Sequence, residues 1–331
     1  MMKRILCNYY VTYRCNAGCE FCDFRHHDKF RSSPHAGLED VLDNLAQLKK
    51  TGIRIVDFTG GEPLLNPDLP EMLAAAKSMG MMTSVTTNCL LYPKKAGELK
   101  GKVDLLHFSL DSIIPDKHNR IREADCYNHV MFSIEKALSL GERPDILFTV
   151  TEHNYHEIED LYALTSKLKL ILILNPVFSH HRNEVISEDA LTTIEELSKL
   201  PYIYLSRGFL RIRRQGGNNI NDPVCKAVSR VIVISPDNKL ILPCYHRAES
   251  AIPIKGDLKA AMAADKYKYY LKNEGRFRFC RGCTINCYLE PSFALSLNKY
   301  MFDGIPGKIK YIKTKFFYQR FTKGINKSAV F

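Results

Sequence analysis

The middle of the chain alternates short runs rich in β-branched and aromatic residues with longer stretches in which apolar residues recur every three to four positions. The short runs are typical of strands and the longer stretches of amphipathic helices, so the alternation predicts βα units around a parallel sheet. The fold class expected is therefore α/β, a partial (β/α)6 barrel of the TIM type with right-handed crossovers. The expected strands are Leu6–Thr12, Ile55–Thr59, Thr83–Thr87, Leu105–Leu110, Ile146–Thr151 and Leu170–Leu174.

This alternation stops after Asn175, and a small α+β extension is expected to follow it. Ser187 is suited to cap the helix that opens this extension. Residues 230–244 then have the pattern of a hairpin, and a further helix is expected to end near Lys272. The predicted organisation is a barrel over residues 1–190, an extension over 191–300 and a C-terminal tail over 301–331.

Composition favours a protein that stays in the cytoplasm and binds metal. The chain has 331 residues, 45% of them hydrophobic, which is enough for a sizeable core. Neither a signal peptide nor a run of eighteen apolar residues is evident. Eleven cysteines in a reducing compartment favour soft-metal ligation over disulfides. Eight have ligand-like spacings, which leaves Cys7, Cys89 and Cys126 as buried small hydrophobes.

Three of the cysteines, Cys15, Cys19 and Cys22, have the spacing C-x3-C-x2-C. A four-iron four-sulfur cluster bound by only three thiolates keeps one iron open for another ligand. The alternative is a structural zinc site, whose fourth ligand would be His26 or His27.

The cysteine spacing, with aromatic Phe21 just before the third cysteine, resembles the radical S-adenosylmethionine (radical SAM) enzymes. The resemblance implies that S-adenosylmethionine chelates the open iron through the amino and carboxylate groups of its methionine moiety. It also implies reductive cleavage of that cofactor to a 5′-deoxyadenosyl radical, with the electron coming from a reductant such as flavodoxin or ferredoxin. Phe21 is expected to contact the cofactor.

The sequence Gly60-Gly61-Glu62-Pro63 follows the second expected strand and matches the GGEP motif of the same family. The resemblance assigns Gly60, Gly61 and Glu62 to the methionine amino group. Glycines allow a ligand to approach the backbone, and a carboxylate accepts hydrogen bonds from an ammonium group. Taken alone, GGEP is also an ordinary tight turn.

Two further strand ends complete the expected cofactor site. Ser109 ends the fourth strand and Arg120 follows eleven positions later; relatives use such a pair on the cofactor ribose and carboxylate. A solvated cation at a helix start is the alternative for Arg120. Asn88 is expected to contact the cofactor as well. Cys89 stands where relatives have glycine, which puts a positive φ at that position in doubt.

The remaining cysteines with ligand-like spacings lie in the extension, which resembles the SPASM/twitch extensions of radical SAM enzymes. Too few are present for two auxiliary clusters, so one auxiliary four-iron cluster is implied. A zinc ribbon would use two C-x2-C pairs, and only one exists here. The sequence leaves open which four of the five bind the cluster: Cys225, Cys244, Cys280, Cys283 and Cys287.

No catalytic acid or base can be assigned from the sequence. In several relatives an acidic residue directly after the second auxiliary cysteine takes the substrate proton, but here Tyr245 and His246 follow. A neutral phenol is a poor base, so Tyr245 is expected to be a packing residue.

The C-terminal segment contributes to a net charge of +11 and combines lysines with apolar Ile305, Ile309, Ile312 and Phe316 at helical spacing, widened by Phe317 and Phe321. Such a helix is expected either at an anionic membrane surface, as a peripheral contact, or docked on the barrel with solvated lysines. No nucleic-acid motif accompanies the charge, so no nucleic-acid partner is expected.

The resemblance thus implies hydrogen abstraction from a small metabolite, sugar or lipid-related substrate, leading to its oxidation or rearrangement. Modification of a peptide or protein is the alternative. The first strand begins within ten residues of the start, which leaves little room for a leader-binding module and favours a small substrate. A non-catalytic iron–sulfur protein that relays electrons is the alternative of another class.

Overall fold

The computed structural model describes residues 5–22, 32–178 and 186–318. In this part of the chain, the strands form one ten-stranded sheet in the order β10-β9-β8-β1-β2-β3-β4-β5-β6-β7. Pairing is parallel from β8 through β1 to β7 and antiparallel between β8, β9 and β10. The strands are β1 (Leu6–Thr12), β2 (Ile55–Gly60), β3 (Met82–Thr87), β4 (Leu105–Ser109), β5 (Asp145–Val150), β6 (Leu172–Pro176), β7 (Ile203–Tyr204), β8 (Val231–Ile234), β9 (Lys239–Leu242) and β10 (Ser250–Pro253).

The six strands expected from the sequence are all present, in a mixed α/β fold whose sheet is open rather than closed into a barrel. Their observed ends differ from the expected ones by two residues at most. The seventh parallel strand, β7, was not expected because two residues are too few to show a pattern. The expected hairpin is formed by β8 and β9, with Asn238 at φ 54° in its turn.

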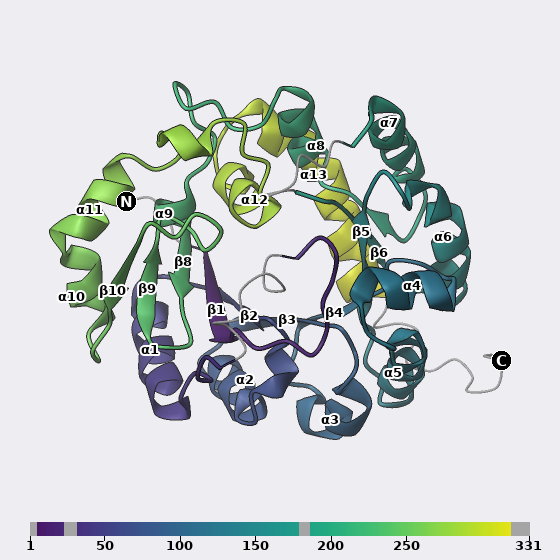
Figure 1. Cartoon of the computed structure of the whole chain (residues 1–331), viewed down its shortest axis with the longest axis horizontal. Helices are drawn as coiled ribbons and strands as arrows, with labels where there is room; N and C mark the ends of the chain where they lie inside the picture. The colour runs from purple at the N-terminus through teal and green to yellow at the C-terminus, as the bar shows by residue number, and fades with distance from the viewer. Residues whose placement is uncertain (1–4, 23–31, 179–185, 319–331) are drawn as a thin grey trace.

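Helices cover the outer face of the sheet, as Figure 1 shows for α1 to α6. Ser187 caps α7 as predicted, since its side chain accepts a hydrogen bond from the Ala190 amide. The helix expected to end near Lys272 is divided in two at Ala264, whose backbone is extended. The helices are α1 (Leu38–Lys50), α2 (Leu69–Ser78), α3 (Tyr92–Leu99), α4 (Pro115–Arg122), α5 (Tyr127–Ser139), α6 (Ile158–Lys167), α7 (Glu188–Leu197), α8 (Arg207–Arg214), α9 (Ala227–Arg230), α10 (Leu258–Ala263), α11 (Asp265–Lys272), α12 (Asn286–Ala294) and α13 (Lys299–Ile312).

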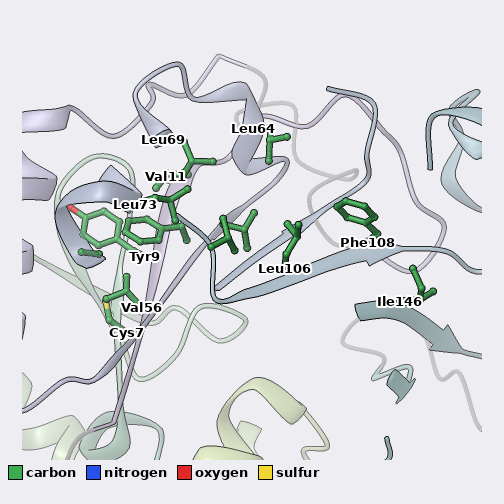
Figure 2. Close-up of a cluster of buried hydrophobic side chains, with 14 of the residues drawn as sticks. Cys7, Tyr9, Val11, Val56, Leu64, Leu69, Leu73, Leu106, Phe108 and Ile146 are labelled. Atoms are coloured by element: carbon green, nitrogen blue, oxygen red, sulfur yellow. The ribbon is translucent and has the colours of Figure 1, made fainter. Parts of the chain in front are cut away.

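The main core lies between the sheet and these helices. Figure 2 shows part of it, with Tyr9 of β1, Val56 of β2 and Phe108 of β4 among the labelled side chains. Cys7, Cys89 and Cys126 are fully buried, as the sequence predicted. The concave face of β2 differs from this packed face, because Asp57 lies between the fully buried Val56 and Phe58 yet remains partly accessible to solvent.

The C-terminal extension continues the barrel sheet, because β8 pairs in parallel with β1. In Figure 1, α12 lies between the two sides of the open sheet. Tyr288 of α12 is hydrogen-bonded to Asn8 of β1, and Glu290 accepts a hydrogen bond from Tyr204 of β7 at 2.9 Å. This helix therefore bridges the open side of the sheet. Within the described ranges, no helix is long and apolar enough to cross a membrane.

Candidate functional site

The first three cysteines lie in the loop that follows β1, at the carboxyl end of the parallel strands, where barrel enzymes place their chemistry. The C-terminal end of α4 holds this loop. The Gly18 amide donates to the Arg122 carbonyl and the Glu20 amide to the Ile121 carbonyl, each at 3.0 Å. Within the loop, the Cys22 amide donates to the Cys19 carbonyl at 3.1 Å.

The GGEP turn packs directly against the chain that leads into this loop. The Gly61 amide donates to the Thr12 carbonyl at 3.0 Å, and the Glu62 amide donates to the Arg14 carbonyl at 2.9 Å. A Cβ atom on Gly60 would lie 1.9 Å from the Thr12 oxygen, and one on Gly61 would lie 2.2 Å from the Arg14 oxygen. Gly60 also has a φ of 151°, which disfavours a side chain there. The glycines are therefore needed for the contact between the two loops, a reason that sequence reasoning did not supply.

Glu62 is buried and joins the GGEP turn to the end of β3. Its carboxylate accepts hydrogen bonds from the Thr87 hydroxyl and the Asn88 amide, both at 2.8 Å, and from the Leu64 amide at 3.1 Å. Burial raises the pKa of Glu62 to about 7 even though these donors lower it. The Asn88 side chain donates in turn to Asn16 of the cysteine loop at 2.8 Å, so Glu62 and Asn88 together position that loop.

The next position, Cys89, adopts φ 70°. The left-handed geometry that the sequence put in doubt is therefore present with cysteine in the place of glycine. Ser109, the last residue of β4, is also buried. It lies on the strand next to β3, whose end carries Asn88.

Arg120, the residue expected to bind the cofactor carboxylate, is exposed, whereas Arg122 is buried. Residues two positions apart point to different sides of a helix. The Arg122 guanidinium forms an ion pair with Asp111 and lies 5.4 Å from the centre of the Phe21 ring. Its Nη1 donates to the Cys19 sulfur at 3.5 Å.

Sequence reasoning missed Arg122, although the helical pattern contained a signal for it. His118, one turn earlier on α4, is also buried, so Arg122 lies on the face of the helix that packs inward. The Arg122 Nε is buried and has no hydrogen-bond partner among the described residues. An unpaired donor beside Cys19 suits an anionic ligand at this position.

Four cysteines of the extension are brought together. Burial raises the pKa of the Cys225 thiol well above its ordinary value, and the neighbouring Cys283, Cys244 and Cys280 raise it further. Burial also raises the pKa of Cys280 to about 11, with a contribution from Cys283. Neutral thiols crowded in this way become thiolates readily only when cations are bound among them.

Asn218 organises the backbone around these cysteines. Its side-chain oxygen accepts from the Cys225 amide at 3.1 Å, while its nitrogen donates to the Cys280 carbonyl at 3.1 Å. A Cβ atom on Gly217 would lie 2.4 Å from the Gly282 oxygen, so only glycine permits the close approach of these two segments.

Cys287 is oriented differently from these four residues. It lies at the start of α12, and burial of its thiol raises its pKa to about 12, with a further contribution from Asp57 of β2. The other auxiliary cysteines do not contribute to this shift. Asp57 itself has its pKa raised to about 6 by burial, opposed by a hydrogen bond with Ser84. Asp57 is thus the charged side chain with the largest effect on Cys287.

Among the residues whose positions are described, no three Cys, His, Asp or Glu side chains are close enough together to hold one metal ion. A four-iron cluster is larger than one ion, so its thiolates stand farther apart. His26 and His27, the candidate zinc ligands, lie outside the described residues.

Comparison with known proteins identifies the class of this protein. The model of the radical SAM superfamily matches residues 9–165. A probable GTP 3',8-cyclase of Methanococcus maripaludis is 26% identical over 295 residues, which cover 82% of this chain and 94% of the relative. A second probable GTP 3',8-cyclase, from Sulfolobus acidocaldarius, is 28% identical over 286 residues, which cover 80% of this chain and 89% of the relative.

Two solved structures are similar in fold. Streptococcus suis SuiB bound to S-adenosylmethionine has a TM-score of 0.63 at 17% identity, covering 82% of this chain and 68% of that chain. Native anSMEcpe with bound AdoMet has a TM-score of 0.62 at 16% identity, and the match covers 96% of this chain and 98% of that chain. The chain therefore contains a radical SAM domain, and this match together with the GTP 3',8-cyclase relatives indicates an enzyme rather than a non-catalytic electron-transfer protein.

Proposed function

We propose that this enzyme binds a four-iron cluster through Cys15, Cys19 and Cys22 and uses S-adenosylmethionine to remove a hydrogen atom from a small polar metabolite or sugar. The observation that carries the proposal is the contact between the cysteine loop and the GGEP turn, which meet through the amides of Gly61 and Glu62. When bound, the cluster and its cofactor supply a radical able to break an unactivated C–H bond.

The chain's own part in this chemistry is to position the cofactor and exclude water. Phe21, Asn88 and Ser109 are proposed to contact the cofactor. We assign the charge-assisted contact with its carboxylate to Arg122 rather than Arg120, since Arg122 is buried beside Cys19 and has a free Nε. Glu62 already accepts three hydrogen bonds from the chain, so its main role is to hold the Gly60-Gly61 turn in place.

The extension is proposed to be a SPASM/twitch-like module with one auxiliary four-iron cluster. Its ligands would be Cys225, Cys244, Cys280 and Cys283, since each of the other three raises the pKa of Cys225. This cluster would accept an electron from the substrate during an oxidation. An external reductant of the flavodoxin or ferredoxin type would supply the electron that the first cluster needs. Cys287 would remain a free thiol.

The concave face of the sheet is the proposed position of the substrate. Asn8, Asp57 and Ser84 are neighbours in register on β1, β2 and β3. On the opposite side, Asn286 of α12 donates to Asn175 of β6 at 3.2 Å. Amides, a hydroxyl and a carboxylate form hydrogen bonds with hydroxyl and amino groups, which favours a sugar-like or amine-bearing substrate.

The proposal is tested by anaerobic incubation of reconstituted enzyme with S-adenosylmethionine, dithionite and metabolite fractions separated by charge. Release of 5′-deoxyadenosine should rise with a neutral or cationic fraction, and mass spectrometry of that fraction should show a product lighter by two hydrogens or an isomer. Stimulation by peptides alone would favour the peptide-modifying alternative. No cleavage under any condition would contradict the proposal.

GTP cyclisation is a second candidate, because relatives named GTP 3',8-cyclase are 26–28% identical over about four fifths of this chain. The same assay with GTP as the added compound distinguishes the two. If GTP gives a cyclised product and the neutral and cationic fractions give no stimulation, the substrate is GTP rather than a small polar metabolite.

A further inference from the structure

The C-terminal helix α13 docks on the barrel through small and polar residues. A Cβ atom on Gly307 would lie 3.2 Å from the Leu205 carbonyl oxygen, so the backbones approach closely there. One turn later, the Tyr311 hydroxyl donates to the Asp145 carboxylate at 2.6 Å. Beyond the helix, the ammonium group of Lys315 lies 2.8 Å from the same carboxylate. These contacts fix which side of α13 faces the barrel.

The side of α13 that faces away from the barrel is apolar. Phe302, Ile305, Ile309 and Ile312, at spacings of three, four and three, are 57%, 38%, 48% and 48% exposed. An amphipathic helix that docks on a domain normally buries such a stripe. Here the arrangement is inverted, because the polar side is the one that is held. The docked-helix expectation is thus correct for the contact itself, but wrong for the solvation of Lys315, which is buried.

In the segment that precedes the helix, Leu295 is 48% and Leu297 is 90% exposed as well. We call the four exposed apolar side chains of the helix the α13 face: Phe302, Ile305, Ile309 and Ile312.

Positive charge borders the α13 face. Lys299 and Lys313 are exposed at the two ends of the helical stripe. The one acidic residue between positions 291 and 331, Asp303, forms an ion pair with Arg211 at 2.8 Å. The partner of this face should therefore be apolar at its centre and negatively charged at its rim.

We infer that the α13 face binds the surface of an anionic lipid bilayer, with the helix axis parallel to the membrane plane. Apolar side chains that enter the headgroup boundary and lysines that contact anionic headgroups act together in such helices. A second copy of the chain would instead bring the lysines of both copies together, which opposes pairing of this face with itself. The inference concerns attachment and does not depend on which substrate the enzyme uses.

Co-sedimentation of the full reconstituted chain with vesicles tests the inference. Most of the protein should pellet with phosphatidylglycerol-containing vesicles at low salt, and little with pure phosphatidylcholine. Raised salt should weaken the binding, because it screens the lysines. If the protein stays in the supernatant with anionic vesicles at low salt, the inference is wrong.

Paired variants assign the binding to the α13 face. Phe302→Ser with Ile309→Ser should weaken partitioning about tenfold or more. Lys299→Glu with Lys313→Glu should abolish the preference for anionic lipid. The controls change equally exposed positions elsewhere, with Phe132→Ser on α5 (55% exposed) and Lys100→Glu after α3. Equal loss in variants and controls would contradict a specific face.

Size-exclusion chromatography without lipid gives an independent check. A dimer that Phe302→Ser and Ile309→Ser convert to a monomer would assign the α13 face to a second copy and overturn the inference. Cleavage of S-adenosylmethionine by the same variants should be unchanged, so attachment and chemistry are measured separately. Deletion of the helix is unsuitable, because it would leave Asp145 buried without Tyr311 and Lys315.

Discussion

The two cysteine sets of this enzyme differ in how the chain positions them and in the number of thiols. Cys15, Cys19 and Cys22 lie on a loop whose position is fixed by other elements, with Cys15 exposed. The four cysteines of the extension come from three separate segments, whose backbones Asn218 joins through hydrogen bonds; Cys225 and Cys244 are buried, and Cys280 and Cys283 are half-buried. Three thiols leave a ligand position open, whereas four occupy every iron of a cubane.

The two sets also differ in their neighbours. The open set, that of the first loop, is next to Arg122, and Asn88 joins its loop to Glu62 of the GGEP turn and to the end of β3. In the closed set, that of the extension, Cys225 and Cys244 belong to a second hydrophobic cluster with Tyr10 and Tyr288, and Cys283 packs against this cluster.

The largest expected effect is loss of the open set. Replacement of Cys15, Cys19 and Cys22 by alanine should abolish cleavage of S-adenosylmethionine and lower the iron content of reconstituted protein from about eight to about four atoms per chain. Measurement of iron and of 5′-deoxyadenosine checks both. Zinc instead of iron in the protein as purified would contradict the assignment.

The closed set is tested by a matched pair of cysteines. Cys280→Ala should disrupt the auxiliary cluster and bring the iron content to about four atoms per chain, while Cys287→Ala should keep about eight. The reason is that none of the other four cysteines contributes to the raised pKa of Cys287, whereas Cys283 contributes to that of Cys280. Equal iron loss in both variants would make Cys287 a ligand.

The next comparison is between variants of Arg122 and Arg120. Arg122→Ala leaves Asp111 as a buried charge without its partner and should lower stability by about 3–5 kcal/mol. Arg120→Ala, on the exposed side of α4, should change stability little. Denaturant unfolding of the two variants measures this difference. Binding of S-adenosylmethionine should also weaken only in the Arg122 variant; weaker binding in the Arg120 variant alone would restore the expectation made from the sequence.

The smallest expected effect concerns Asp57, whose pKa burial raises to about 6 from an ordinary value of 3.8. The folded state therefore holds a proton that the unfolded state releases, and stability falls as pH rises from about 4 to 6. Asp57→Asn removes this cost of about 1–3 kcal/mol. Its thermal midpoint should exceed that of the parent at pH 8 and approach it at pH 4.5. A constant difference across this range would exclude titration of Asp57.

Local patterns were sufficient to predict the strands, the cysteine triplet and the GGEP turn. The observed β1 has the predicted bounds, because a β-branched and aromatic run depends on neighbours along the chain. The glycine motif was found for the same reason, although its contact with Thr12 and Arg14 depends on a loop nearly fifty residues away. The cap at Ser187 is likewise a local interaction.

Tertiary packing decided the remaining features. Arg120 and Arg122 are both cations on one short helix, and only the docking of α4 against the cysteine loop determines which of them is buried. The separation of Cys287 from the other cysteines depends on where α12 bridges the sheet.

The C-terminal helix separates most clearly what the sequence predicts from what only the tertiary structure determines. Its sequence established an amphipathic, basic helix, because the spacing of apolar residues follows from the helical repeat alone. The sequence did not establish which side would be exposed. Asp145, buried at the start of β5, binds Tyr311 and Lys315 on the polar side, so α13 is held by that side and its apolar residues face outward.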